Sequence, residues 1–142
     1  MGTHPQIIGR DMRHGWAGNY ARQPDSVVVT RPAGGDSPIT FGTPLKYDGN
    51  GNVIAMGASA TAAQFVGVAI SEIKSSLSFL TQGAGQYAPG EAVGVLQRGS
   101  IHVYCQRGTP ALGGAVYVRI AANSSYSSAV VGGFEAEADS SN

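Results

Sequence analysis

The chain has 142 residues, a formal net charge of zero, and charged side chains at only 13% of its positions. This length suits a single domain with a sizeable core. A chain so weakly charged has no long-range field to attract nucleic acid or an anionic membrane, so we expect neither as a partner. Glycine occurs 21 times without a Gly-X-Y period, which indicates many tight turns between short strands.

The first 26 residues show no sustained hydrophobic period, and we expect them to form an extended arm. The arm contains apolar, aromatic and arginine side chains that need a surface to pack against. These candidate interface residues are Ile7, Ile8, Arg10, Arg13, Trp16, Tyr20 and Arg22. The arm either wraps its own domain or reaches a neighbouring subunit, where arginine and aromatic residues often dominate the binding energy.

Short strands are predicted where β-branched or alternating residues lie between turn signals. DGNGN at residues 48–52 is typical of a hairpin turn, and Arg98-Gly99 is interpreted as a second turn. Ser59 or Thr61 is expected to cap a single helical turn. The predicted strands are residues 27–30, 39–47, 53–56, 65–70, 92–97, 100–105, 115–120 and 129–131.

Residues 71–86 fit a helical face and a strand face about equally well, but their serine and glycine content favours one long structured loop. The loop adds Leu77, Phe79 and Leu80 to the candidate interface residues.

The whole pattern predicts an all-β fold, a small antiparallel β-barrel or sandwich. It would consist of the N-terminal arm (1–26), a β-barrel domain (27–135) and a polar acidic tail (136–142). The hairpin around Arg98 supplies the core candidates Val93, Val95, Ile101, Val103 and Cys105, with Arg98 exposed.

No group of residues suits catalysis, a cofactor or a metal. His102 and Cys105 are an odd number of residues apart on one predicted strand, so their side chains would face opposite sides. The acidic residues Glu135, Glu137 and Asp139 near the end of the chain are interpreted as a solvated end. We therefore predict a protein that is not an enzyme and needs no cofactor.

The single cysteine cannot form an internal disulfide, and no charged-then-apolar leader opens the chain. Its longest apolar runs, such as residues 65–70, are far shorter than the roughly 20 residues of a membrane-spanning helix. We expect a soluble protein made in a reducing cytoplasm.

The order of several motifs resembles the structural cement proteins of tailed bacteriophages, a family of capsid decoration or minor head proteins. The motifs are GWAGNYA at 15–21, ITFGTPL at 39–45, FVGVAI at 65–70, YAPGEAVGVLQRGSIHVY at 87–104 and GGAVYVR at 113–119. The resemblance implies a compact β-rich protein, commonly trimeric, on the outer surface of the head. It also implies a further β segment after GGFEAEAD, whereas the sequence stops at Asn142. If the fold needs that strand, a neighbour supplies one, the tail stays loose, or the chain is incomplete.

We therefore predict a non-enzymatic capsid decoration (cement) protein, made in the host cytoplasm, that bridges neighbouring major capsid subunits. It would be a homo-oligomer, a trimer, attached through the arm and the loop of residues 71–86. One alternative is a carbohydrate- or receptor-binding β module of a phage spike or adhesin, with Tyr126 beside Asn123 as its faint candidate site. The other is a small trimeric β-barrel hydrolase similar in size to a nucleotide pyrophosphatase, which would need acidic metal ligands.

Overall fold

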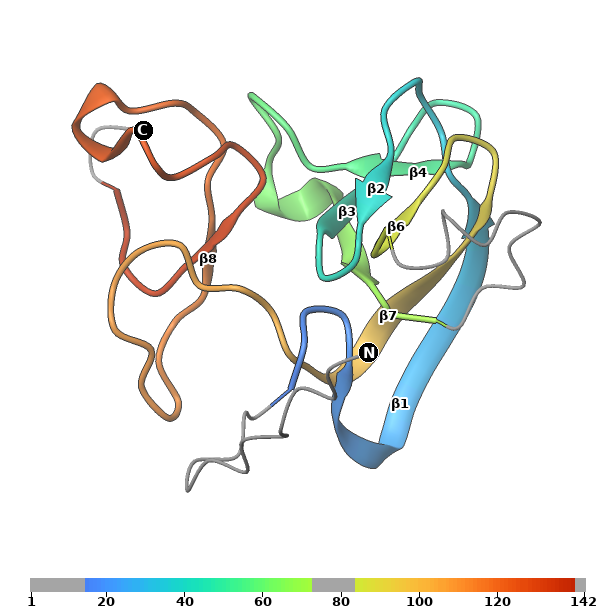
Figure 1. The fold of residues 1–142 in the computed structure, drawn as a ribbon, viewed down its shortest axis with the longest axis horizontal. Coiled ribbons are helices and arrows are strands. Elements are labelled where there is room, and N and C mark those ends of the chain that lie inside the picture. Colours follow the sequence, from blue (N-terminus) through green and yellow to red (C-terminus); the bar gives the residue numbers. More distant parts are fainter. Residues whose placement is uncertain (1–14, 73–83, 140–142) are drawn as a thin grey trace, which may run out of the picture.

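The computed structural model describes residues 15–72 and 84–139, which form a β body (residues 15–102) and a C-terminal lobe (residues 103–139) beside it (Figure 1). Its strands are β1 (Tyr20–Pro32), β2 (Ile39–Thr40), β3 (Pro44–Tyr47), β4 (Val53–Ala55), β5 (Phe65–Ala69), β6 (Gln86–Tyr87), β7 (Ala92–Ile101), β8 (Tyr117–Val118) and β9 (Phe134–Glu135). Two 3₁₀ turns complete the described elements, η1 (Ala62–Gln64) and η2 (Ser124–Tyr126).

The β body is built on a five-stranded antiparallel sheet in the order β1-β7-β5-β3-β4, beside the two-stranded pair β2-β6. The chain just after β1 returns to β4 through a single bridge between Ala33 and Val53. Because this bridge does not extend into a ladder, the sheet curls without closing into a barrel. The predicted all-β antiparallel class is confirmed in a sandwich-like rather than a barrel form.

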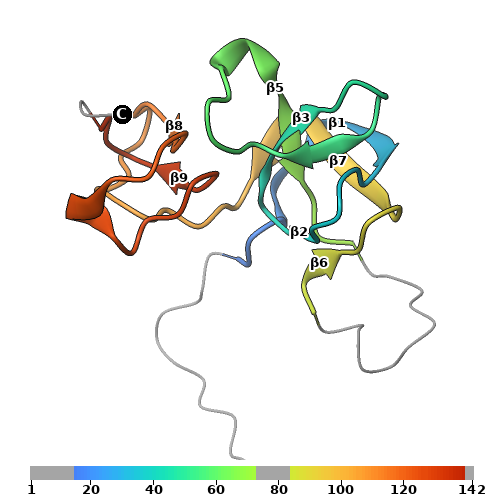
Figure 2. The same cartoon turned by 90° about the horizontal axis from the view of Figure 1, so that it is seen from above.

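Figure 2 shows the strands of the β body curling around one another, and their buried hydrophobic side chains form one core cluster. Two of the predicted core residues, Val93 and Val95 of β7, are fully buried, as the inward face of a central strand requires. Ile101, Val103 and Cys105 are only partly buried, because β7 ends at Ile101 and the chain then leaves for the C-terminal lobe. The other core members are Ala33, Ile39, Leu45, Val53, Ala69 and Tyr87.

Tyr87 is the largest fully buried side chain of this core. Its hydroxyl donates a hydrogen bond to the carbonyl oxygen of Ile70 at 2.7 Å, and the ring of Phe41 packs edge-on at 5.1 Å between centroids. Burial, with a smaller contribution from the charge of Glu72, raises the pKa of Tyr87 to about 12. The phenol is therefore a neutral structural group whose one polar atom is satisfied.

The local turn predictions are confirmed at two places. Strands β3 and β4 form a hairpin around DGNGN, where one carboxylate oxygen of Asp48 accepts from the amides of Asn50 and Asn52 at 2.8 and 2.9 Å. The side-chain hydrogen bond from Asn52 is the main cause that lowers the pKa of Asp48. The predicted helical turn is η1, where the amide of Thr61 donates to the side-chain oxygen of Gln64 at 3.0 Å.

The predicted turn at Arg98-Gly99 is wrong, because β7 continues through both residues. The register of β1 against β7 shifts after Arg22, so β1 contains extra residues opposite this point. Gly99 has a φ of 131°, and a Cβ there would lie 3.2 Å from that of Ser26. The glycine therefore marks an irregular, bulged part of the ladder rather than a chain reversal. Arg98 is exposed and pairs with Asp25 across the strands at 2.9 Å.

Other strand boundaries also differ from the predicted ones. Strand β1 begins at Tyr20, so residues 20–26, assigned to the arm above, form part of the ladder with β7. The predicted strand 39–47 is split at Gly42, whose φ of 79° turns the chain from β2 into β3. In the C-terminal lobe, the strand predicted at 115–120 shrinks to β8, which pairs with β9. Residues 129–131, also predicted as a strand, are not in one.

Candidate functional site

The C-terminal lobe is organised around a buried ionic network. Arg119 and Glu135 have exposed fractions of only 4% and 3%, and the Arg119 Nε donates to Glu135 Oε1 at 2.6 Å. Arg119 Nη1 also donates to Asp139 Oδ2 at 3.0 Å, and Arg107 Nη1 lies 3.4 Å from Glu135 Oε2. The interpretation of Glu135 and Asp139 as a solvated end is therefore wrong, because two arginines distant in sequence enclose these carboxylates.

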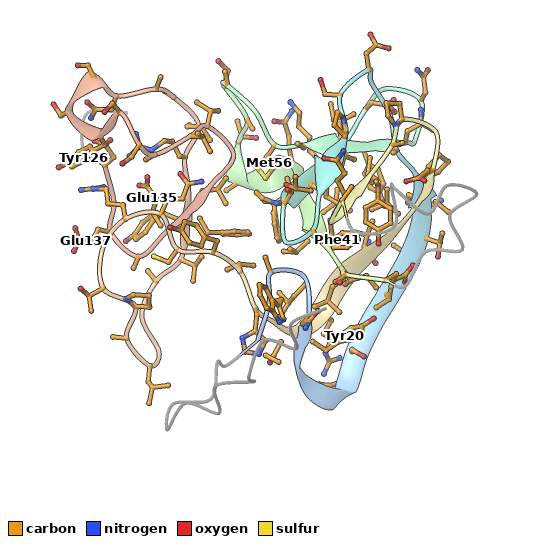
Figure 3. The ribbon with its side chains drawn as sticks, in the orientation of Figure 1. Tyr20, Phe41, Met56, Tyr126, Glu135 and Glu137 are labelled. Carbon is orange, nitrogen blue, oxygen red and sulfur yellow. The ribbon has the colours of Figure 1, made fainter. Side chains whose placement is uncertain are left out.

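The chemistry of this network is structural. The hydrogen bond with Glu135 is the main cause that raises the pKa of Arg119, so the guanidinium keeps its charge beside this carboxylate. In Figure 3, Glu135 and Glu137 lie within the lobe, apart from Phe41 and Tyr20 of the β body. Across residues 15–72 and 84–139, no group of three or more His, Cys, Asp or Glu side chains could hold a metal ion.

Tyr126 and Asn123, the faint candidates for a carbohydrate site, take part in the lobe's own structure. The Asn123 side chain donates to Asp139 at 2.9 Å and accepts from the amide of Ser125 at 2.9 Å, so it begins η2. The guanidinium carbon of Arg107 lies 4.2 Å from the centroid of the Tyr126 ring. With one ring face covered and the amide already bonded, this pair lacks the open aromatic platform of a sugar site.

The segment that leads into the arm is anchored at Gly18. The carbonyl oxygen of Gly18 accepts from the amide of Ser71 at 2.8 Å, and its amide donates to His102 at 2.9 Å. Gly18 has a φ of 84°, and a Cβ there would lie 2.7 Å from the backbone nitrogen of Ser71. Only glycine fits this position. Because Gly18 is hydrogen-bonded to Ser71, the start of the arm lies beside the residues that follow β5.

The turn between β2 and β3 contacts both Ala17, at the start of the arm, and Gly85, just after the loop of residues 73–83. The amide of Phe41 donates to the carbonyl oxygen of Gly85 at 2.9 Å. A Cβ on Gly42 would lie 2.9 Å from the Cβ of Ala17. The start of the arm and both ends of the loop thus meet at one place, which we call the arm–loop base: residues 17–19, 41–42, 71 and 85.

The predicted interface residues fall partly at this base. Trp16 is largely exposed beside it. Tyr20 is half-buried in β1, and its pKa is raised mainly by burial and secondly by the charge of Glu72. The backbone of Arg22 pairs with Ser100. The rest lie outside the described residues and stay predictions: Ile7, Ile8, Arg10, Arg13, Leu77, Phe79 and Leu80.

An apolar groove that the sequence analysis missed lies between η1 and the C-terminal lobe. Its volume is about 580 Å³, and its lining, which includes no charged side chain, comes from both parts of the molecule. Met56 and Phe65 contribute from the β body, and Val116, Tyr117 and Ile120 from the lobe. The alternating apolar pattern at residues 115–120 is a sequence signal of one wall, but it predicts a strand and not a groove.

Within the described ranges, no helix has the length and apolar character needed to cross a bilayer.

Comparison with known proteins identifies a family. A family model described as XM1 gp53 minor capsid protein matches residues 5–142, which include the β body and the C-terminal lobe. No curated protein and no solved structure matches the chain. The predicted membership of a phage capsid-associated structural family is thereby confirmed. The chain belongs to the XM1 gp53 minor capsid protein family.

Proposed function

We propose that this protein is a decoration (cement) protein, which binds the outer surface of the phage head and bridges neighbouring major capsid subunits as a homotrimer. Its family makes it a structural component of the capsid and so of the virion. The proposal adds three features to this: the position on the outer surface of the shell, the bridging of capsid subunits and the trimer.

The arm–loop base is the observation that carries the proposal. Both segments predicted to make contacts depart from the same small region of the β body, where Gly18 and Ser71 are hydrogen-bonded. Two adhesive segments with one origin can contact adjacent subunits of a shell while the β body stays between them. The 14 residues that precede Gly15 have a maximum length of about 45–50 Å, enough to reach beyond their own domain.

The rest of the described structure supports a role without catalysis. The buried carboxylate of Glu135 is held by Arg119 and Arg107, and the buried hydroxyl of Tyr87 is bonded to a backbone oxygen. These groups stabilise the fold, and multivalent attachment needs only a stable body with adhesive segments.

Deletion of residues 1–14 tests the role of the arm and leaves Gly18 and its hydrogen bonds in place. Binding to heads that lack this protein, measured by co-sedimentation, should weaken at least about tenfold, because interface energy concentrates in a few anchoring side chains. The circular dichroism spectrum should not change. Removal of residues 140–142 is the matched control at the other terminus, and it should leave binding intact.

A second measurement tests the bridging. Heads decorated with the full-length protein should resist heating better than bare heads, and heads mixed with the deletion variant should behave like bare heads. If binding survives both the arm deletion and a Leu77→Ser, Phe79→Ser, Leu80→Ser triple variant, neither segment attaches the protein to heads. Decoration that leaves the heat resistance of the shell unchanged would contradict the bridging role.

A further inference from the structure

We propose that Leu112 of one copy of this chain docks into the apolar groove of a second copy. The inference rests on the proposed homotrimer and deepens it, because it names the surfaces through which the copies meet.

Leu112 is presented as a fixed knob. It is fully exposed at the tip of a tight turn, in which the amide of Gly114 donates to the carbonyl oxygen of Ala111 at 3.0 Å. The base of this loop is held to the rest of the lobe, since the amide of Ala136 donates to the carbonyl oxygen of Arg107 at 2.9 Å. A leucine held in this way loses little conformational freedom on binding, and its whole side chain is free to be buried.

The groove offers a cavity that suits such a knob. Its volume of about 580 Å³ exceeds that of a leucine side chain, so the neighbouring residues of the turn can enter with it. Phe65, Val116 and Tyr117 line the groove and are themselves exposed, so that the apolar surface extends over its rim. This combination of an apolar pocket and an exposed apolar rim is typical of a docking surface rather than of ordinary surface variation.

The knob and the groove lie at different ends of the lobe in the same chain. In Figure 1, the loop tip after residue 108 (orange) projects away from η1 (green), which borders the groove. Leu112 is not among the residues that line the groove. The chain therefore has an apolar projection and an apolar recess that it does not bring together itself.

The charge pattern favours a second copy over a charged partner. Residues 108–116 contain no charged side chain, and neither does the lining of the groove. Two uncharged apolar surfaces match each other, whereas a strongly charged partner would find no opposite charge on either. Because the two surfaces differ, the contact is head-to-tail, and it produces a closed ring such as a trimer when the rotation between copies closes.

The distribution of exposed apolar residues fits an interface on the C-terminal lobe. The lobe is the smaller part of the molecule, yet it contains six of the ten large hydrophobic side chains that are exposed in the described structure. They are Tyr104, Leu112, Val116, Tyr117, Tyr126 and Val130.

Sedimentation velocity over a range of concentrations tests the proposal. The wild-type protein should be an oligomer, and Leu112→Ser should raise its dissociation constant at least about tenfold, since anchoring residues typically account for this much. Val27→Ser is the matched control, because Val27 is an exposed apolar residue of the β body that lies outside the lobe and the groove. It should leave the dissociation constant unchanged.

Cross-linking locates the contact. In a Cys105→Ser background, one chain with Leu112→Cys and another with Ala62→Cys, which is exposed and lines the groove, are mixed and mildly oxidised. A disulfide-linked pair should form in the mixture and not in either chain alone.

Three results would overturn the inference: a wild-type protein that stays monomeric at all concentrations, an oligomer insensitive to Leu112→Ser, or a mixture without cross-linked pairs. These failures can be separated from failure of the proposed function. An oligomer that is insensitive to Leu112→Ser and still needs residues 1–14 to bind heads removes only the knob-and-groove contact. Cross-linked oligomers that do not bind heads remove only the decoration role.

Discussion

The β body and the C-terminal lobe are held together by different forces. The β body buries an apolar core inside a five-stranded sheet, and its longest ladder joins β1 to β7. The lobe has only the two-residue strands β8 and β9, and its most buried side chains include the charged pair Arg119 and Glu135. The first arrangement is typical of a self-sufficient scaffold, and the second of a part that gains stability from its contacts.

This difference decides how each part should respond to damage. Truncating a side chain in an apolar core lowers the free energy of unfolding by an amount that grows with the cavity left behind, and it destabilises the whole sheet. A buried ionic network fails where one partner is removed, because the remaining charge is left without compensation in an apolar setting. We therefore expect global effects from changes in the β body and local effects from changes in the lobe.

The largest effect is expected from Leu45→Ala in β3. Leu45 is fully buried in the core, and its truncation should lower the free energy of unfolding by about 2–5 kcal/mol. Chemical denaturation followed by circular dichroism measures this loss. Val130→Ala, which truncates an exposed side chain of the lobe, should change the free energy of unfolding by less than about 0.5 kcal/mol. Equal losses in the two variants would contradict the distinction between the parts.

Glu135→Gln should have a strong effect confined to the lobe. The substitution keeps the shape of the side chain but removes the charge that faces Arg119 and Arg107. Hydrogen exchange should accelerate at the lobe amides of Gln106 and Arg119, which donate to β9 and to the residue before it.

The control for this experiment is Glu137→Gln, because the Glu137 side chain is exposed and its pair with Arg107 is longer, at 3.8 Å. It should leave the exchange rates near those of the wild type. Amides of Val93 and Val95 in the β body should stay protected in both variants. Faster exchange there after Glu135→Gln would show that the two parts unfold together.

The smallest effect is expected from Tyr87→Phe. The variant leaves the carbonyl oxygen of Ile70 without its hydrogen bond and should lower the free energy of unfolding by about 1–3 kcal/mol at neutral pH. The pKa of Tyr87 is raised from 10.0 to about 12 in the folded protein. The folded state therefore keeps the phenol proton to a higher pH than the unfolded state does. The stability that the buried neutral phenol contributes is complete below pH 10 and is lost as the pH rises through 12.

The stability of the wild-type protein should accordingly fall more steeply than that of Tyr87→Phe between about pH 10 and pH 12. Denaturation curves at several alkaline pH values measure the two slopes. Tyr104→Phe, a change at an exposed tyrosine, should follow the wild type. Parallel curves for wild type and Tyr87→Phe would show that the buried phenol does not govern this window.

The sequence predicted features whose causes are local. The DGNGN hairpin, the turn at Thr61 and the core positions Val93 and Val95 each follow from residues within one segment. Gly99 was misread because glycine has the same local signature in a turn and in a bulge, and only the extra residues of β1 distinguish them.

The burial of Glu135 was unpredictable for a similar reason. Its partners Arg119 and Arg107 lie 16 and 28 residues away, and an acidic residue near the end of a chain is usually solvated. The groove was missed because its walls come from residues 56–65 and 116–134, which no short window of sequence contains. The family resemblance, by contrast, depended on the order of motifs along the chain and not on their spatial arrangement.

The hydrogen bonds of Gly18 have a mechanical consequence. Tension applied to the segment before it would be shared between the exit from β5, through Ser71, and the end of β7, through His102. Both are inner strands of the sheet, so these two hydrogen bonds would share the load with the edge strand β1, into which the chain continues at Tyr20. Under the proposed attachment through the arm, a force from the shell would therefore reach β5, β7 and β1 together and not β1 alone.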